Sequence, residues 1–324
     1  EPKEPQKQDY PDESMFAAAY DYYKNNLVDY KDKRKYIELL KQKTKEKEFN
    51  DVFEYLRRID YPSFDSFREK TDIGEPGAFK PALVAEHIAD PRNKLDFLTD
   101  INTGILYFFN GKNWVPNAEP YLEFVVNCIL REENRQSHYM NILHVLKGFT
   151  YKEIRFSQKV ACENGLLNVE TGEFSDFSKD EMALYYIPVK YDPDATCPNW
   201  EAFIKSVVNP DDYAIIQEWS GYILLPDYRF HKLLWVHGDG RNGKGVWQRT
   251  LEAILGEKNV SNISLEEFDG NHRFSMRQLY GKLFNPCSEP RTIKNLETTL
   301  LKYATGQDTI EAEIKGKQNR LKFR

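Results

Sequence analysis

The stretch LLWVHGDGRNGKGVWQRTLEAIL, from Leu233 to Leu255, decides the expected fold. Its first four residues are apolar and predict a short buried strand, and its last ten, from Val246 onward, predict a helix. Between them lies a glycine-rich loop with Gly238, four further residues, Gly243 and Lys244. A strand, a glycine loop and a helix in this order are typical of a phosphate-binding loop. The segment therefore predicts an α/β core that binds a nucleotide.

The residue types of this loop suit the chemistry of a triphosphate. Glycine lets the backbone curl so that successive N–H groups point at phosphate oxygens. The N-terminus of the following helix adds the positive end of its dipole. Lys244 adds a point charge for the β- and γ-phosphates. An unrelated glycine-rich turn is the alternative, and the flanking strand and helix argue against it. We expect the nucleotide to contact the whole loop: Gly238, Asp239, Gly240, Arg241, Asn242, Gly243, Lys244, Gly245 and Val246.

The residue after the lysine departs from the usual pattern. Phosphate loops commonly place Ser or Thr there as a Mg²⁺ ligand, whereas this chain has Gly245. The metal would then be held by phosphates, water and a downstream acid. The run LFNPCSE, from Leu283 to Glu289, is a candidate second strand that ends in such an acid. Glu289 is the predicted residue for orienting the attacking water and for anchoring Mg²⁺. A solvent-facing glutamate at a strand end is the alternative.

Composition limits the class of protein. The chain has 324 residues, of which 40% are hydrophobic, and this suffices for two or three packed domains. Its net charge of -6 means that any DNA contact must come from local basic patches. The four cysteines form no CxxC pair, which argues against a zinc site or a disulfide framework and favours a reducing, cytoplasmic compartment. No apolar run is long enough to span a bilayer, so no membrane partner is expected.

The sequence before the loop divides into three expected parts. Residues 1–12 are rich in Pro, Gln and charge and predict a linker. Residues 13–77 predict a helical, bundle-like domain. It holds a basic run, Lys31 to Lys47, for which a DNA contact and a solvated helix face both remain open because acids are interleaved. The breaker IGEPGAF, from Ile73 to Phe79, marks the expected boundary.

Residues 78–190 predict a mixed α+β domain. A short helix near 81–91 precedes a hairpin over 103–116, with Asn110-Gly111 as its expected two-residue turn. Helix followed by hairpin is typical of a winged-helix-like module. Two helices are expected near 121–131 and 137–146, and a strand–turn–strand unit over 164–174. The ATPase core would then occupy residues 191–324.

Several segments together resemble one family. They are NGLLNVETGEF (164–174), YDPDATCPNWEAFI (191–204), EWSGYILLPD (218–227) and GDGRNGKG (238–245). From about Phe79 to Arg324 the chain resembles the helicase-primase replication proteins of phages, poxviruses and archaeal plasmids. These proteins carry a superfamily 3 helicase, which is an AAA+ type of ATPase. Glycine after the loop lysine is also found in this family. The phosphate-loop pattern is generic, whereas the combination of segments in this order is specific.

The resemblance implies an AAA+ core, ATP and Mg²⁺ as cofactors, and a homo-oligomeric, hexameric ring. It implies single-stranded or forked DNA as partner, and a primase domain on the same polypeptide. The run ATGQDTIEAEIKGK, from Ala304 to Lys317, looks like the motif before a DNA-contacting hairpin. Lys315 and Lys317 are the expected contacts to the DNA backbone. The family's sensor asparagine and trans-acting arginine would follow Arg324, so the core is expected to be incomplete and to bind nucleotide more readily than it hydrolyses it.

Two other interpretations stay open on the residues alone. The chain could be a non-enzymatic DNA-binding and oligomerisation module that docks a primase or origin DNA, and ATP turnover would discriminate the two. A metabolite or nucleotide kinase with the same loop is disfavoured, because the residues after the loop follow the helicase pattern up to Lys317 instead of supplying a lid and an acceptor site.

Overall fold

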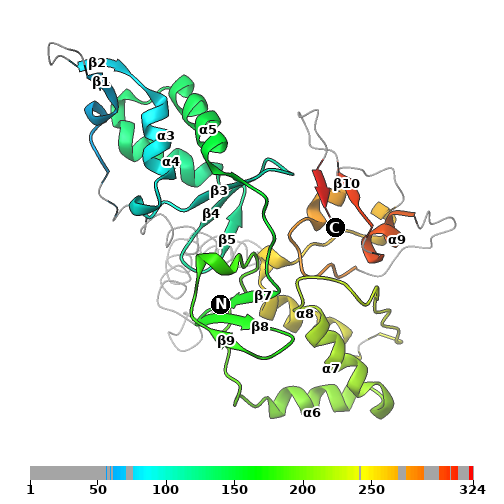
Figure 1. Ribbon diagram of the computed structural model, residues 1–324. Helices are drawn as coiled ribbons and strands as arrows, with labels where there is room; N and C mark the ends of the chain where they lie inside the picture. The colour runs from blue at the N-terminus through cyan, green and yellow to red at the C-terminus, as the bar shows by residue number, and fades with distance from the viewer. Residues whose placement is uncertain are drawn as a thin grey trace, which may run out of the picture. The chain divides into compact units, whose positions relative to one another are not determined.

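A computed structural model describes residues 56, 59, 61–70, 76–240, 242–268, 275–287, 299–306, 308–312 and 321–323 (Figure 1). The chain separates into two compact units. The first combines Glu1–Ala85 with Glu119–Val145, and the second combines Glu86–Ala118 with Leu146–Arg324. The predicted linker 1–12, the basic run 31–47 and nearly all of the predicted helical domain up to residue 60 lie outside the described residues.

The first unit holds a small hairpin and two helices. Strand β1 (Arg68–Lys70) pairs antiparallel with β2 (Pro76–Phe79), so part of the expected breaker is a strand, and it runs across the predicted boundary at residue 77. Helix α4 (Glu119–Leu130) buries one face, and α5 (Gln136–Thr150) begins in this unit. Both helices confirm the sequence prediction. Helix α3 (Pro81–Ala89) confirms the short helix expected after the breaker.

The second unit contains a four-stranded sheet with the order β5-β4-β3-β6. Strands β3 (Phe97–Asp100), β4 (Leu106–Phe109) and β5 (Trp114–Pro116) form an antiparallel meander. The chain returns through α4 and α5, and β6 (Tyr151–Lys152) then pairs with β3 in parallel.

The predicted hairpin is therefore present, but its turn is longer than the expected two residues. Phe109 pairs with Trp114, which leaves four residues in the loop. The Asn110 carboxamide accepts hydrogen bonds from the backbone N–H groups of Lys112 and Asn113, each at 2.9 Å. The Asn110 side chain thus closes the loop, because asparagine can mimic a backbone turn. Within these four residues only Gly111 adopts a positive φ, of 92°.

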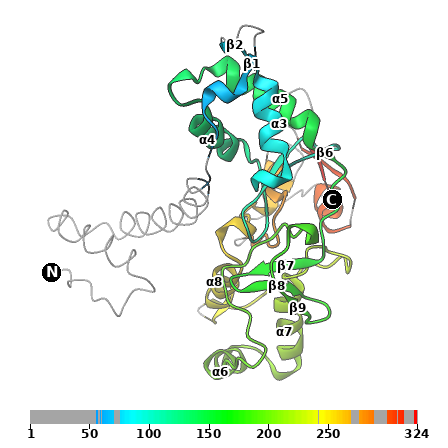
Figure 2. The ribbon, with the colours of Figure 1, turned by 60° about the vertical axis from the view of Figure 1, so that its left-hand side comes forward.

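A second sheet, also in this unit, supports the segment before the phosphate loop. Strands β7 (Lys159–Cys162), β8 (Gly165–Asn168) and β9 (Phe174–Ser175) are antiparallel and confirm the strand–turn–strand unit predicted over 164–174. Helices α6 (Pro198–Val207), α7 (Tyr213–Tyr222) and α8 (Lys244–Leu255) follow. Figure 2 shows this sheet close to α7 and α8. Their shared core consists of Val160, Ile187, Ile204, Ile223, Trp247, Leu251 and Leu255.

The last described segments form a separate small core. Helix α9 (Thr299–Thr305) is followed by β10 (Ile310–Ala312), which pairs antiparallel with β11 (Leu321–Phe323). The buried residues there are Ile263, Phe268, Met276, Ile310 and Ala312. Short 3-10 helices are η2 (Phe64–Phe67), η3 (Pro91–Asn93), η4 (Arg131–Glu133), η5 (Lys179–Glu181), η6 (Pro210–Asp212), η7 (Glu257–Asn259), η8 (Leu265–Phe268) and η9 (Ser275–Leu279).

Two segments that we expected to be strands are not. Residues 233–236 have no regular structure, and the side chains of Leu233 and Trp235 are 52% and 64% exposed. A buried strand needs neighbours that satisfy its backbone, and within the described residues this run pairs with none. In the described part of the second run, residues 283–287, Phe284 forms one isolated parallel bridge with Val260, and no continuous ladder is present. An AAA+ sheet therefore stays a prediction.

Candidate phosphate-loop site

Helix α8 fixes the position of the candidate phosphate loop. Trp247, Leu251 and Leu255 recur at intervals of four, so they lie on one face, and all three are buried in the core shared with α6 and the β7–β9 sheet. Gly243, with φ of 87°, precedes the helix, and Lys244 is its first residue. The hydrophobic face of α8 thus anchors the loop at the helix N-terminus.

Lys244 closes the loop. Its ammonium donates to the carbonyl oxygen of Gly238 at 2.8 Å and to the side-chain oxygen of Asn242 at 3.0 Å. An ammonium has three donors, so the charge is held between the two ends of the loop with capacity left for a ligand oxygen. The Asn242 contact was not foreseen from the sequence, which placed this residue in the loop without giving it a role.

Three of the four glycines in the loop differ in the space around them. A Cβ on Gly238 would lie 1.9 Å from the Asn242 amide nitrogen, and one on Gly243 would lie 3.1 Å from both Phe203 and Val207 of α6. A Cβ on Gly245 would meet only the far end of the Arg249 side chain, at 3.1 Å. The first two glycines allow close approach, whereas Gly245 has room for a side chain.

This difference gives a matched pair of variants. Gly238→Ala should weaken ATP binding by about tenfold, since the Asn242 amide would have to turn away and give up its contact with Lys244, and a hydrogen bond to a charged group contributes about 1.5–3 kcal/mol. Gly245→Ala should bind ATP within about threefold of wild type, because a flexible guanidinium can shift. Equilibrium titration with a fluorescent ATP analogue measures both. Equal affinities in the two variants would contradict the closed loop.

The N-terminus of α8 follows the loop directly. The N–H groups of Val246 and Trp247 both donate to the Gly243 carbonyl, at 2.9 and 3.0 Å. The first turn holds no acidic residue, and no side-chain hydrogen bond from the cap residue covers it. The positive end of the helix dipole is therefore available to an anion at the loop.

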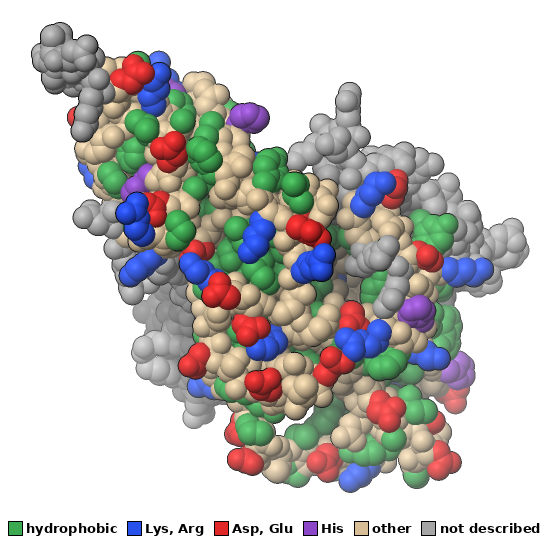
Figure 3. Space-filling model, viewed as in Figure 1, with side chains coloured by type: hydrophobic (Ala, Val, Ile, Leu, Met, Phe, Trp, Pro, Cys, Tyr) green, Lys and Arg blue, Asp and Glu red, His purple; other side chains and the backbone are tan. Residues whose placement is uncertain are grey.

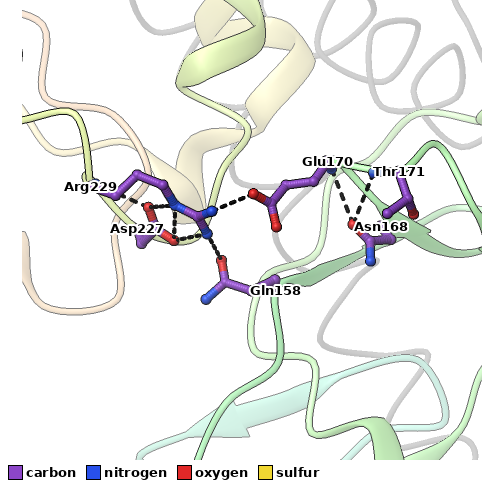
Figure 4. A network of polar contacts seen from close by, with 6 residues as sticks. All are labelled: Gln158, Asn168, Glu170, Thr171, Asp227 and Arg229. Atoms are coloured by element: carbon purple, nitrogen blue, oxygen red, sulfur yellow. Dashed lines mark hydrogen bonds and ion pairs between the residues drawn. The ribbon is translucent and has the colours of Figure 1, made fainter.

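An arginine network holds the segment that leads into the loop (Figure 4). The Nε of Arg229 donates to both carboxylate oxygens of Asp227, at 2.9 and 3.0 Å. The same guanidinium donates to Glu170 and, at 3.4 Å, to Gln158. Glu170 belongs to the β8–β9 turn, where Asn168 accepts from the backbone N–H of Glu170 at 3.1 Å. The network therefore joins the segment 164–174 to the segment 218–227.

This network should make stability depend on pH. Its hydrogen bonds from Arg229 lower the pKa of Asp227 below the usual value. A carboxyl whose folded pKa is lowered stabilises the fold above its unfolded pKa, about 3.9, and loses that contribution as pH falls through the folded value. Asp227→Asn should therefore reduce the loss of stability between pH 5 and pH 3, by less than about 1 kcal/mol for a partly exposed pair. Urea unfolding at both pH values measures this, with the exposed Asp211→Asn as control; an equal effect of both variants would count against the network.

The structure brings together part of the predicted site. Gly238, Asn242 and Lys244 are in contact, and Asp239, Gly240, Gly243, Gly245 and Val246 complete the described loop. The other predicted residues, Arg241, Glu289, Lys315 and Lys317, lie outside the described residues.

The described residues offer no ready-made metal site. No group of three or more His, Cys, Asp or Glu side chains lies together among them. Gly245 supplies no hydroxyl, so a Mg²⁺ ion at this loop would depend on the nucleotide, on water and on a residue such as Glu289.

The cysteines at 128, 162, 197 and 287 form no disulfide with one another. Of the helices the structure describes, none has the length and apolar character needed to span a membrane.

Comparison with known families matches two regions of the chain, one before the loop and one that includes it. Residues 85–209 match the family model described as D5 N terminal like. Over these residues the chain is therefore similar to the D5 N-terminal domain. This domain is found in primase-helicase replication proteins of phages and viruses, so it supports a D5-like replication protein. It ends just after α6, the helix that packs against Gly243. Residues 236–323, which include the loop, match a family of unknown function (DUF5906). A search of curated proteins found no significant match.

Proposed function

We propose that the chain is the ATP-dependent DNA helicase part of a viral, phage or plasmid primase-helicase, with a superfamily 3 AAA+ core. The observation that carries this proposal is the closed loop at the start of α8, in which Lys244 is held by Gly238 and Asn242. The loop follows a D5 N-terminal-like domain, and this order fits a replication protein that couples priming to strand separation.

The proposed reaction is phosphoryl transfer from ATP to water. The loop N–H groups, the positive end of α8 and Lys244 would bind the triphosphate. Mg²⁺, held by the phosphates and by Glu289, would neutralise charge that develops on the transferred group. The parallel bridge from Val260 to Phe284 supports this arrangement, since the segment that leaves the bridge runs on to Glu289.

DNA would be engaged by Lys315 and Lys317 in the pore of a hexameric ring. The chain between β10 and β11 carries both lysines, and these two strands pair antiparallel, with Ala312 opposite Leu321. A hairpin frame with lysines between its strands suits contact with the phosphates of one DNA strand. The nucleotide state would move this hairpin along the strand.

DNA-stimulated ATP turnover tests the proposal. The chain should hydrolyse ATP faster with single-stranded DNA than without it. Glu289→Gln should remove turnover while nucleotide binding remains. The double variant Lys315→Ala/Lys317→Ala should lose the stimulation and keep the basal rate. Turnover no higher than that of Glu289→Gln, with and without DNA, together with a failure to bind ATP, would instead favour the non-enzymatic DNA-binding and oligomerisation module.

A further inference from the structure

An exposed hydrophobic surface lies at the β6 edge of the four-stranded sheet. Ile101 is 60% exposed, and Phe149 and Tyr151 are each 51% exposed. The N–H of Ile101 donates to the carbonyl of Lys152 at 3.0 Å, so the two backbone segments are adjacent. Figure 2 labels β6 where α5 ends, and Figure 3 shows hydrophobic side chains at the surface of that region. We call Ile101, Phe149, Tyr151, Lys152 and Arg155 the edge patch.

The backbone beneath the two aromatic rings is firmly anchored. Thr150, which lies between them, is buried, and its hydroxyl donates to the Leu146 carbonyl at 2.8 Å. The same hydroxyl is 2.8 Å from that of Thr99 on β3. Lys147 donates to the carbonyl of Gly104 at 3.0 Å. Because this backbone is already held in place, the segment that carries the two rings should lose little conformational entropy when a ligand covers them.

The sequence around Phe149 and Tyr151 carries more positive than negative charge. Residues 147–155 hold three cations (Lys147, Lys152 and Arg155) and one carboxylate (Glu153), which is a local net charge of +2 in a chain of -6. Glu153 pairs with Arg155 at 3.1 Å. The nearby Asp100 is buried, and its carboxylate accepts from the hydroxyl and N–H of Thr103 at 2.7 and 3.1 Å. Lys152 is exposed beside Tyr151.

We propose that the edge patch binds a single strand of DNA, with bases stacked on Phe149 and Tyr151 and phosphates against Lys152 and Arg155. Exposed rings alone would suit many partners. Rings interleaved with cations are what a single strand requires, because every base has a stacking face and every nucleotide a phosphate. The choice of DNA as partner rests on the proposed function. The patch shares no residue with the predicted DNA contacts Lys315 and Lys317.

Binding of a labelled thymidine oligonucleotide to the chain, without nucleotide, tests the patch. The double variant Phe149→Ala/Tyr151→Ala should bind at least about tenfold more weakly, as removal of two stacking rings predicts. Tyr151→Phe keeps a ring and should bind like wild type. Phe174→Ala removes an exposed ring elsewhere in the same unit and serves as the matched control. Lys152→Gln should lower the slope of log affinity against log salt by about 1.

A crosslinking experiment gives a local readout. An oligonucleotide with 5-iodouracil should form adducts on the peptide that contains Phe149 and Tyr151. Wild-type affinity in the double variant, or adducts found only elsewhere, would overturn the patch. A fall in affinity as large for Phe174→Ala would also overturn it, because the effect would then not be specific to these rings. Unchanged thermal unfolding of each variant confirms that it is folded.

Failure of the patch and failure of the helicase proposal are distinguishable. Lys244→Ala should bind the oligonucleotide as wild type does, since the assay contains no nucleotide. Normal binding at the patch by a chain that neither binds nor hydrolyses ATP would overturn the helicase proposal alone. DNA-stimulated turnover together with unchanged binding by the Phe149→Ala/Tyr151→Ala variant would sink the patch alone.

Discussion

Lys244→Ala should weaken ATP binding by about 10- to 100-fold. The ammonium is the one side-chain charge that the described loop directs between its two ends, with contacts to Gly238 and Asn242. A hydrogen bond to a charged group contributes about 1.5–3 kcal/mol, and about 1.4 kcal/mol corresponds to tenfold in affinity. Isothermal titration with a non-hydrolysable ATP analogue measures the loss.

Two further variants test whether the loss of ATP affinity is specific to the Lys244 ammonium. Lys190→Ala removes an exposed lysine elsewhere in the second unit and should leave affinity unchanged. Lys244→Arg keeps the charge but replaces a compact ammonium by a planar fork, so we expect an intermediate affinity. If Lys244→Ala bound ATP as tightly as wild type, the loop would not be a phosphate site, and the proposed function would lose the observation that carries it.

The loop and its helix could be predicted because their signals are local. Glycine spacing, a lysine at the start of a helix and an apolar repeat from Trp247 to Leu255 each depend on a few neighbouring residues. The same holds for the strands around Asn110 and around Gly172. Where a side chain changed the local geometry, as Asn110 does in its four-residue loop, the element was right and the turn was wrong.

What could not be predicted depends on distant contacts. An apolar run such as 233–236 reads as a strand, but a strand also needs a partner, and none pairs with it among the described residues. The Arg229 network links residues 59 positions apart in the chain. In the sequence, only the Asp-x-Arg spacing indicates the local part of this network, the pair of Asp227 and Arg229. The edge patch likewise arises because β6 returns beside β3, which no single segment of sequence reveals.

Trp247→Ala should destabilise the second unit by about 3–5 kcal/mol, the range for truncating a large buried aromatic side chain. Trp247 lies on α8 and is buried against α6 and the β7–β9 sheet. Its neighbour Val246 is 45% exposed, so Val246→Ala should change stability by less than about 0.5 kcal/mol. Urea unfolding measures the difference in stability between these two variants, whose sites are adjacent on α8. Hydrogen exchange of the α8 amides then reports how far the helix itself is loosened.

The surroundings of the Trp247 indole indicate how it stabilises α8 and how its removal should affect ATP binding. Within the described residues its N–H finds no hydrogen-bond partner, so Trp247 acts through packing and not through a polar contact. Trp247→Phe, which keeps an aromatic ring and removes that N–H, should therefore retain most of the stability. Because α8 carries Lys244 at its first residue, loosening the helix in Trp247→Ala should weaken ATP binding as well as stability. Faster exchange in α8 with unchanged ATP affinity would show that the loop is held by contacts other than this core.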